Sequence, residues 1–445
     1  MFKKYRAEIN AILKLGWPIA IVQLLQMSMT FIDTVMVGYL GVESLGAMSI
    51  ATTLYNQIWL FCYGTTSALS PLIAQSYGAD SHKDIAIWLR HGLVVALGMS
   101  AAGICLLLFP GDVIRWLNQP PEVIPMATEY LKWLTLGLPA YLCFFCFRSL
   151  VEATSRARLT MWFMGFGAIA NIVLDFWFIF GGWGIQPMGV AGAALATSLV
   201  QWLMFLGLLV CVLKHPFFRS LDLWQRGLRF RVATFKNMLK VGVPIGISIL
   251  AELLFFGSCT LLMGTIGKVE LAAHHIAFNA VAFAFMIPLG LSSAITIRVG
   301  QAAGRKKDKA VALVGNAGIL LIATIMTAVM LVFMIAPHTV LKLYTEDREL
   351  LALASTLLVV GGVFQIFDGI QLALIACLRG LKDTQRPMLN ALFGFWVVGL
   401  PLGYFLTFHA SAGPVGLWYG MVTALAVAAA LHAHRWHSLR HQFKS

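Results

Sequence analysis

The sequence predicts an all-α integral membrane protein whose twelve transmembrane helices form two parallel six-helix bundles. Composition, the placement of basic residues and an internal repeat support this fold class. Of the 445 residues, 59% are hydrophobic and 11% are charged, whereas soluble domains are nearly half apolar and a quarter charged. This composition excludes a cytosolic enzyme, a disordered chain and a secreted disulfide scaffold. Because one span needs about 20 apolar residues, the chain has room for roughly a dozen.

The basic residues define the expected topology. Twelve apolar segments are expected at about 13–38, 46–73, 86–109, 125–148, 160–182, 188–213, 239–265, 272–297, 311–336, 350–377, 387–408 and 413–433. With the N-terminus in the cytoplasm, 27 Lys and Arg residues fall inside and 5 outside, as the positive-inside rule requires. Both termini are therefore expected in the cytoplasm. The net charge of +13 then reflects topology, so no nucleic-acid partner is expected.

The two halves of the chain repeat each other. Residues 14–78 align without a gap on 240–304, with 18 identities in 65 positions, Pro18/Pro244 among them. Since six spans is an even number, the repeats run parallel, which suits alternating access. The sequence predicts an N-terminal lobe at 1–213, a cytoplasmic linker at 214–238, and a C-terminal lobe with a cytoplasmic tail at 239–445.

Four carboxylates are expected inside the membrane, where an unpaired charge costs several kcal/mol. At about 1.5 Å per helical residue, Glu252 and Asp368 lie roughly 16–18 Å from the inner surface, and Asp33 and Asp175 roughly 26–28 Å. No Lys or Arg is expected at a similar depth. Each lobe therefore has one carboxylate pair, which must take up protons, metal ions or a cationic substrate.

Two amides share helix faces with the first pair. Asn171 precedes Asp175 by four residues, and Gln26 precedes Asp33 by seven, so each amide lies on the carboxylate's face. Asp33, Asn171, Asp175 and Gln26 are therefore candidates for ion coupling or substrate binding.

Pro18 and Pro244 occupy matching places in the first helix of each half. A proline frees a backbone carbonyl and permits a bend. Two interpretations stay open: a fixed kink, or a helix that bends with protonation or ion binding.

The histidines are weaker candidates. His274 and His275 are expected at an outer helix end, either as pH sensors or as capping or interfacial residues. A solvated tail is expected to hold four more, which are His432, His434, His437 and His441.

Three classes of function compete: an ion-coupled transporter, a membrane enzyme and a channel. No Gly-x-x-x-x-Gly-Lys-Ser/Thr phosphate loop occurs, which excludes ATP hydrolysis by that route. The absence of a His-Glu-x-x-His motif disfavours an enzyme. A channel usually assembles several chains around a pore, so a duplicated chain acting as a monomer favours a transporter.

The chain contains several distinctive motifs, which are Lys14-Leu-Gly-Trp-Pro-Ile, Phe31-Ile-Asp-Thr-Val-Met-Val-Gly38, Glu152-Ala-Thr-Ser-Arg-Ala-Arg-Leu-Thr-Met161, Asn171-Ile-Val-Leu-Asp175 and Leu378-Arg-Gly-Leu-Lys-Asp-Thr-Gln-Arg-Pro-Met388. Together they resemble the multidrug and toxic compound extrusion (MATE) family, in its NorM branch.

The resemblance implies the MATE fold, in a bacterial inner membrane. It also implies export of cationic, amphipathic compounds in exchange for Na⁺ or H⁺, with no cofactor beyond the coupling ion. Glu252 and Asp368 match its C-terminal cation site, and Asp33, Asn171 and Asp175 its N-terminal acidic cluster. An ion-coupled exporter of another class, for lipid-linked compounds or metabolites, is the alternative, ahead of a membrane enzyme.

Overall fold

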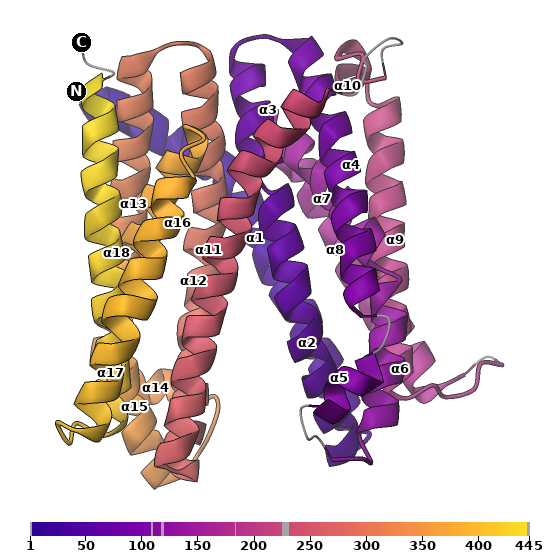
Figure 1. Cartoon of the computed structure of the whole chain (residues 1–445), viewed down its shortest axis with the longest axis vertical. Coiled ribbons are helices and arrows are strands. Elements are labelled where there is room, and N and C mark those ends of the chain that lie inside the picture. The colour runs from indigo at the N-terminus through magenta and orange to yellow at the C-terminus, as the bar shows by residue number, and fades with distance from the viewer. Residues whose placement is uncertain (1, 108–109, 117–119, 183, 225–230, 443–445) are drawn as a thin grey trace. The chain divides into compact units, whose positions relative to one another are not determined.

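The computed structural model describes residues 2–442 except 108–109, 117–119, 183 and 225–230. Apart from one isolated bridge between Gly182 and Ile185, the secondary structure of this part is helical (Figure 1). The first half contains α1 (Phe2–Gly38), α2 (Val42–Thr66), α3 (Leu69–Gly78), α4 (His82–Leu106), α5 (Pro110–Trp116), α6 (Ile124–Thr135), α7 (Leu138–Ala153), α8 (Ala157–Phe180), α9 (Val190–Lys214) and α10 (Pro216–Ser220).

The second half repeats the pattern of long helices. It contains α11 (Val232–Ile266), α12 (Lys268–Gly304), α13 (Asp308–Ile335), α14 (Pro337–Leu341), α15 (Arg348–Gly380), α16 (Gln385–Leu392), the π-helical turn η1 (Phe393–Gly399), α17 (Leu400–Phe408) and α18 (Pro414–Gln442). Helices α16, η1 and α17 form one continuous segment, which occupies the predicted span at 387–408.

Most predicted spans are long apolar helices. Within the described ranges, ten are long and apolar enough to cross a membrane, and α6 with α7, bent by 40°, qualifies as one broken span. The predicted span at 46–73 corresponds to α2 and α3, which do not qualify. Thr, Asn and Gln side chains lower the hydropathy of α2, and α3 has only 10 residues. The chain is a multi-pass membrane protein.

The chain forms two compact units. The N-terminal unit contains residues 21–246, and the C-terminal unit contains residues 1–20 and 247–445. Each boundary follows two residues after a repeated proline, Pro18 or Pro244. The units therefore differ from the lobes expected at 1–213 and 239–445, because the first helix of each half begins in one unit and ends in the other.

Close packing explains why the first helix of each half is divided between the two units. In the C-terminal unit, Gly290 on α12 has no room for a side chain because the backbone of Ala20 lies against it. Glu8 also forms an ion pair with Arg298 on α12. In the N-terminal unit, Gly242 on α11 lies in the same way against the backbone of Thr65 on α2.

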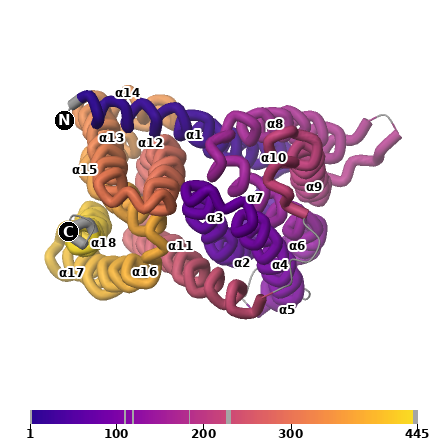
Figure 2. The backbone as a smooth tube through the Cα atoms, turned by 90° about the horizontal axis from the view of Figure 1, so that it is seen from above, coloured from indigo at the N-terminus to yellow at the C-terminus, as the bar shows by residue number. Residues whose placement is uncertain are grey.

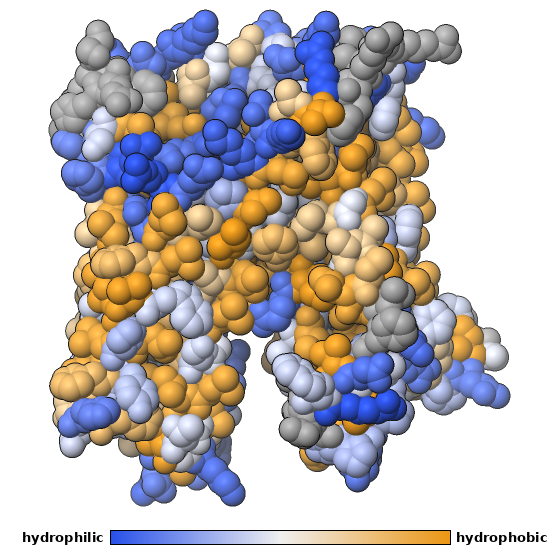
Figure 3. Space-filling view, viewed as in Figure 1, coloured by the Kyte–Doolittle hydropathy of each residue, from blue (hydrophilic) through white to orange (hydrophobic). Residues whose placement is uncertain are grey.

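Each unit is a helix bundle. In the N-terminal unit α9 packs against α6, α7 and α8, while in the C-terminal unit α15 packs against α12, α13 and α18 (Figures 1 and 2). On the face shown in Figure 3, apolar side chains cover most of the middle of the helices, and polar side chains gather toward their ends. This distribution is that of bundles whose sides lie in a bilayer.

Candidate functional site

The N-terminal unit brings together three of the residues that the sequence singles out. Asp33 on α1 is 7% exposed, and Asn171 and Asp175 on α8 are fully buried. Asn171 and Asp175 both lie close enough to Asp33 for polar interaction. Two buried carboxylates this close stay ionised together only when a cation lies between them. Without a cation, the pair holds one shared proton.

This cluster has unused hydrogen-bonding capacity. Within the described part of the chain, one oxygen of Asp33, both oxygens of Asp175 and both amide atoms of Asn171 are buried without a hydrogen-bond partner. Native proteins leave few buried polar atoms in this condition. Four of these five atoms are oxygens, which are the ligands that hard cations prefer. The cluster is therefore equipped to hold a small cation or a proton.

Sequence reasoning missed two members of this cluster. Thr197 on α9 donates its hydroxyl to Oδ2 of Asp33 at 3.2 Å. Tyr130 on α6 is 2% exposed, and the charges of Asp33 and Asp175 both act on its hydroxyl. Neither residue carries a formal charge, so a search for carboxylates inside the apolar spans could not find them.

The C-terminal unit contains the second carboxylate pair. Glu252 on α11 is half-buried, and Asp368 on α15 is 5% exposed. Their charges repel each other, so the two carboxylates lie near each other. The charge of Arg379, next to the end of α15, attracts Glu252. The expectation that no basic residue lies at the depth of the pair stays a prediction.

Two glutamines flank Asp368 on α15 and were also missed. Gln365 precedes it by three residues and donates its Nε2 to the carbonyl of Val281 at 2.6 Å. Gln371 follows it by three residues and is 2% exposed. Both side-chain oxygens are buried without a partner among the described residues, so they are further candidate ligands on the helix that carries Asp368.

Within the described ranges, the remaining predicted residues are not among the polar contacts of Asp33. Gln26 on α1 is half-buried, and within the described ranges no hydrogen bond joins it to Asp33. Pro18 and Pro244 both lie inside continuous helices, α1 and α11. Each therefore removes one intrahelical hydrogen bond without ending its helix.

A buried ion pair lies near the predicted inner end of α7. The side chains of Arg148 and Glu152 are 3% and 7% exposed, and Arg148 Nε donates to Glu152 Oε1 at 2.7 Å. Arg148 Nη2 also donates to Gln23 on α1 at 3.0 Å. The predicted span at 125–148 ends at Arg148 and leaves Glu152 outside the membrane. Their i, i+4 spacing is the signal that identifies the pair.

The histidine tail is only partly solvated. His432 is fully buried on α18, with its Nε2 3.1 Å from the carbonyl oxygen of Pro387, so its assignment to a solvated tail is wrong. His434 is exposed as expected, and the side chain of His441 lies outside the described residues. Helix α18 continues to Gln442, so His432 lies within this helix and is buried in the bundle.

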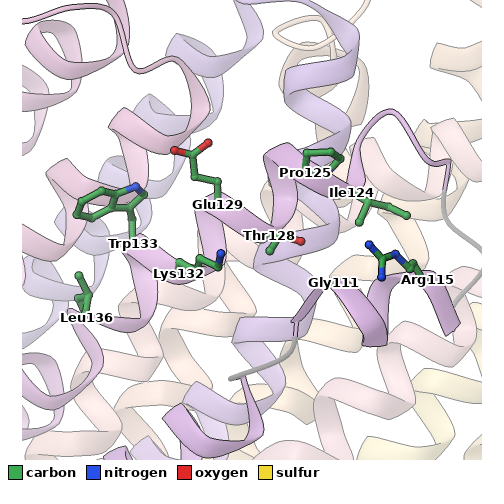
Figure 4. Close-up of a pocket in the computed structure, with 9 residues that line it drawn as sticks. All are labelled: Gly111, Arg115, Ile124, Pro125, Thr128, Glu129, Lys132, Trp133 and Leu136. Carbon is green, nitrogen blue, oxygen red and sulfur yellow. The ribbon is translucent and has the colours of Figure 1, made fainter.

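A cavity of about 770 Å³ opens between α5 and α6. Helix α6 contributes Thr128, Glu129 and Lys132 to its lining, and α5 contributes Arg115 (Figure 4). None of the predicted carboxylates lines this cavity. It is therefore separate from the acidic clusters.

Comparison with known proteins places the whole chain in one family. The family model described as MatE matches residues 18–177 and again residues 244–405. The two matches begin at Pro18 and Pro244, so each half of the repeat carries one copy.

Curated relatives and solved structures agree with this assignment. The chain is 35% identical over 440 residues to a "Probable multidrug resistance protein NorM" of Mesorhizobium japonicum, covering 97% of this chain and 94% of the relative. It is 36% identical to the protein of the same description in Pseudomonas aeruginosa, covering 95% and 88%.

The fold matches that of two solved transporters. One is described as the outward-facing conformation of a multidrug resistance MATE family transporter, with a TM-score of 0.91, 23% identity and 98% and 97% coverage. The other is a eukaryotic MATE transporter, AtDTX14, with a TM-score of 0.87, 20% identity and 99% coverage of both chains. With two copies of the family model and full-length relatives above 30% identity, the chain belongs to the MatE family.

Proposed function

We propose that this protein is a secondary active multidrug exporter that expels cationic, amphipathic compounds in exchange for Na⁺ or H⁺. The observation that carries the proposal is the pair of buried acidic clusters, one in each unit. The N-terminal cluster presents buried carboxylate and amide oxygens that lack a partner within the described residues, and Gln365 and Gln371 beside Asp368 present buried amide oxygens in the same condition. The printed names of the NorM relatives support drugs as the substrate class.

The two clusters are assigned different roles. The half-buried Glu252 with Asp368 is the C-terminal cation site, where Arg379 neutralises part of the negative charge when no cation is bound. Asp33, Asn171 and Asp175, assisted by Gln26, form the N-terminal site for ion coupling or substrate. Because Asp33 aligns with Cys259 and Glu252 with Gln26, the repeated fold carries two unlike sites.

Exchange follows from competition for these charges. A coupling ion that neutralises a carboxylate pair removes the attraction for an organic cation and favours release of that cation. Return of the ion then uses its gradient, and the membrane potential contributes about 2.3 kcal/mol per charge per 100 mV. Pro18 and Pro244 are proposed to be the points where α1 and α11 bend.

The proposed setting is a bacterial inner membrane, with both termini in the cytoplasm and the chain acting as a monomer. The bias of 27 basic residues to 5 supports this orientation. Both units and both clusters lie within a single chain, so no second copy is needed to complete a site.

Efflux of ethidium from proteoliposomes, with Na⁺ and pH gradients imposed separately, tests the proposal. We expect one gradient to drive efflux by the wild-type protein, and Glu252→Gln or Asp368→Asn to abolish it without loss of folded protein. The exposed carboxylate variant Glu43→Gln is the control and retains efflux. Wild-type rates in both amide variants would refute the C-terminal site, and full activity of Asp33→Asn would make the N-terminal cluster structural.

A further inference from the structure

His274 on α12 is one of the most deeply buried polar side chains of the C-terminal unit, at 1% exposed. Its Nε2 lies 3.0 Å from Oγ1 of Thr260 on α11. Thr260 donates its hydroxyl proton to the carbonyl of Phe256 at 3.0 Å, so its oxygen is left to accept from His274. This arrangement places the ring proton on Nε2 and leaves Nδ1 as an acceptor.

That acceptor is unused. Nδ1 of His274 is buried and has no hydrogen-bond partner within the described ranges. Nε1 of Trp418 on α18, whose ring is 5.7 Å from the imidazole, is likewise buried and unpartnered. Leaving a buried polar group unsatisfied costs about 1–3 kcal/mol. An orphaned acceptor on a titratable ring is therefore a specific feature that packing alone does not explain.

The surroundings of the ring are aromatic. Phe278 stacks on His274 with centroids 5.6 Å apart and planes inclined by 25°, while Trp418 meets the ring nearly edge to face at 73°. Helix α11 faces the ring with Thr260 and α18 with Trp418. The neighbouring titratable group whose charge acts on His274 is His275, on its own helix. Aromatic faces stabilise a nearby cation by about 0.5–2 kcal/mol.

The internal repeat gives this position a counterpart. Thr260 aligns with Thr34, and the residue before it, Cys259, aligns with Asp33. His274 itself aligns with Met48. The N-terminal unit therefore has the carboxylate of Asp33 on α1, whereas at the corresponding place the C-terminal unit has the imidazole of His274 on α12, next to Thr260 on α11.

We propose that His274 is a proton-binding site of the C-terminal unit, protonated at Nδ1, in addition to the Glu252 and Asp368 pair. This inference rests on the proposed export function. In the buried setting described above, an imidazolium would have no anionic partner among the described residues, so the neutral ring is favoured. A state in which water reaches Nδ1 binds the proton more tightly, and such a difference in affinity couples proton binding to a conformational change.

His274→Gln is the decisive variant, because a glutamine amide can still donate to Thr260 but cannot take up a proton. His275→Gln is the matched control. With the full chain in lipid nanodiscs, NMR of labelled histidine detects protonation directly. Because the protein in nanodiscs also samples the state in which water reaches Nδ1, we expect one imidazole that titrates between about pH 5 and 8. Its signals are absent from His274→Gln and present in His275→Gln. A His274 ring that stays neutral throughout that range would overturn the proposal.

Transport supplies the second measurement. We expect ethidium efflux by the wild type and by His275→Gln to change by up to about tenfold across the midpoint of this titration, as for a single site. Across the same midpoint, efflux by His274→Gln is expected to lack this change, whereas any pH dependence that comes from the carboxylate pairs is kept. A pH profile of His274→Gln that matches the wild type overturns the proposal. Absence of efflux by the wild type instead refutes the proposed function, while the NMR titration still decides whether His274 binds a proton.

Discussion

Replacing Arg148 with methionine is expected to destabilise the N-terminal unit by about 3–5 kcal/mol, because it leaves a buried carboxylate without its partner. The magnitude follows from the geometry: Arg148 and Glu152 are 2.7 Å apart, and their side chains are 3% and 7% exposed. The lost bond to Gln23 on α1, at 3.0 Å, adds to the effect. Arg148 therefore both balances a charge and fastens α1 to α7.

Thermal or SDS unfolding of the purified protein in detergent micelles, analysed as a double-mutant cycle, measures this effect. The double variant Arg148→Met/Glu152→Leu removes both charges and is expected to lie within about 1 kcal/mol of the wild type or above it. Arg115→Met is the control: it breaks an ion pair with Asp112 whose side chains are 70% and 71% exposed, and is expected to cost less than about 1 kcal/mol. A double variant as unstable as the sum of the two single variants would refute the reasoning.

Two further substitutions test the packing of the C-terminal unit. Gly290→Val would drive a side chain into the backbone of Ala20 and is expected to cost about 3 kcal/mol, the upper end for overpacking, or to prevent folding. Gly38→Ala, with nothing within 4 Å of the added atom, leaves the melting temperature nearly unchanged. His432→Ala removes a buried imidazole and is expected to cost about 1–3 kcal/mol, whereas the exposed His434→Ala changes stability by less than about 0.5 kcal/mol. Equal melting temperatures within either pair contradict the packing described for it.

The long helices and the duplication were predictable because both depend on local pattern. An apolar run identifies a span regardless of what packs against it, and the repeat is visible in the positions of Gly and Pro. The segment predicted as one span at 46–73 is divided into α2 and α3, because an apolar average does not register a turn at Ser67. The division of α1 and α11 between the two units, at Ala20 and Gly246, could not be predicted, since it depends on backbone contacts between helices that are distant in the sequence.

The acidic residues of the candidate site were identifiable because a carboxylate is conspicuous among apolar residues. Their neutral partners were not. Thr197, Tyr130 and Gln365 belong to the sites only through where α9, α6 and α15 pack, and their residue types are common in membrane helices. The pairing of Arg148 with Glu152 was missed because position near a span end suggested solvent, while burial depends on the packing of α7.

The central claim is that the buried carboxylates of each unit bind the coupling ion in competition with an organic cation. The most direct test adds tetraphenylphosphonium to the purified protein in weakly buffered detergent solution and measures proton or Na⁺ release. The account predicts release by the wild type, and reduced release when either Asp33 and Asp175 or Glu252 and Asp368 are changed to their amides. Release that is undiminished in both double variants would contradict it.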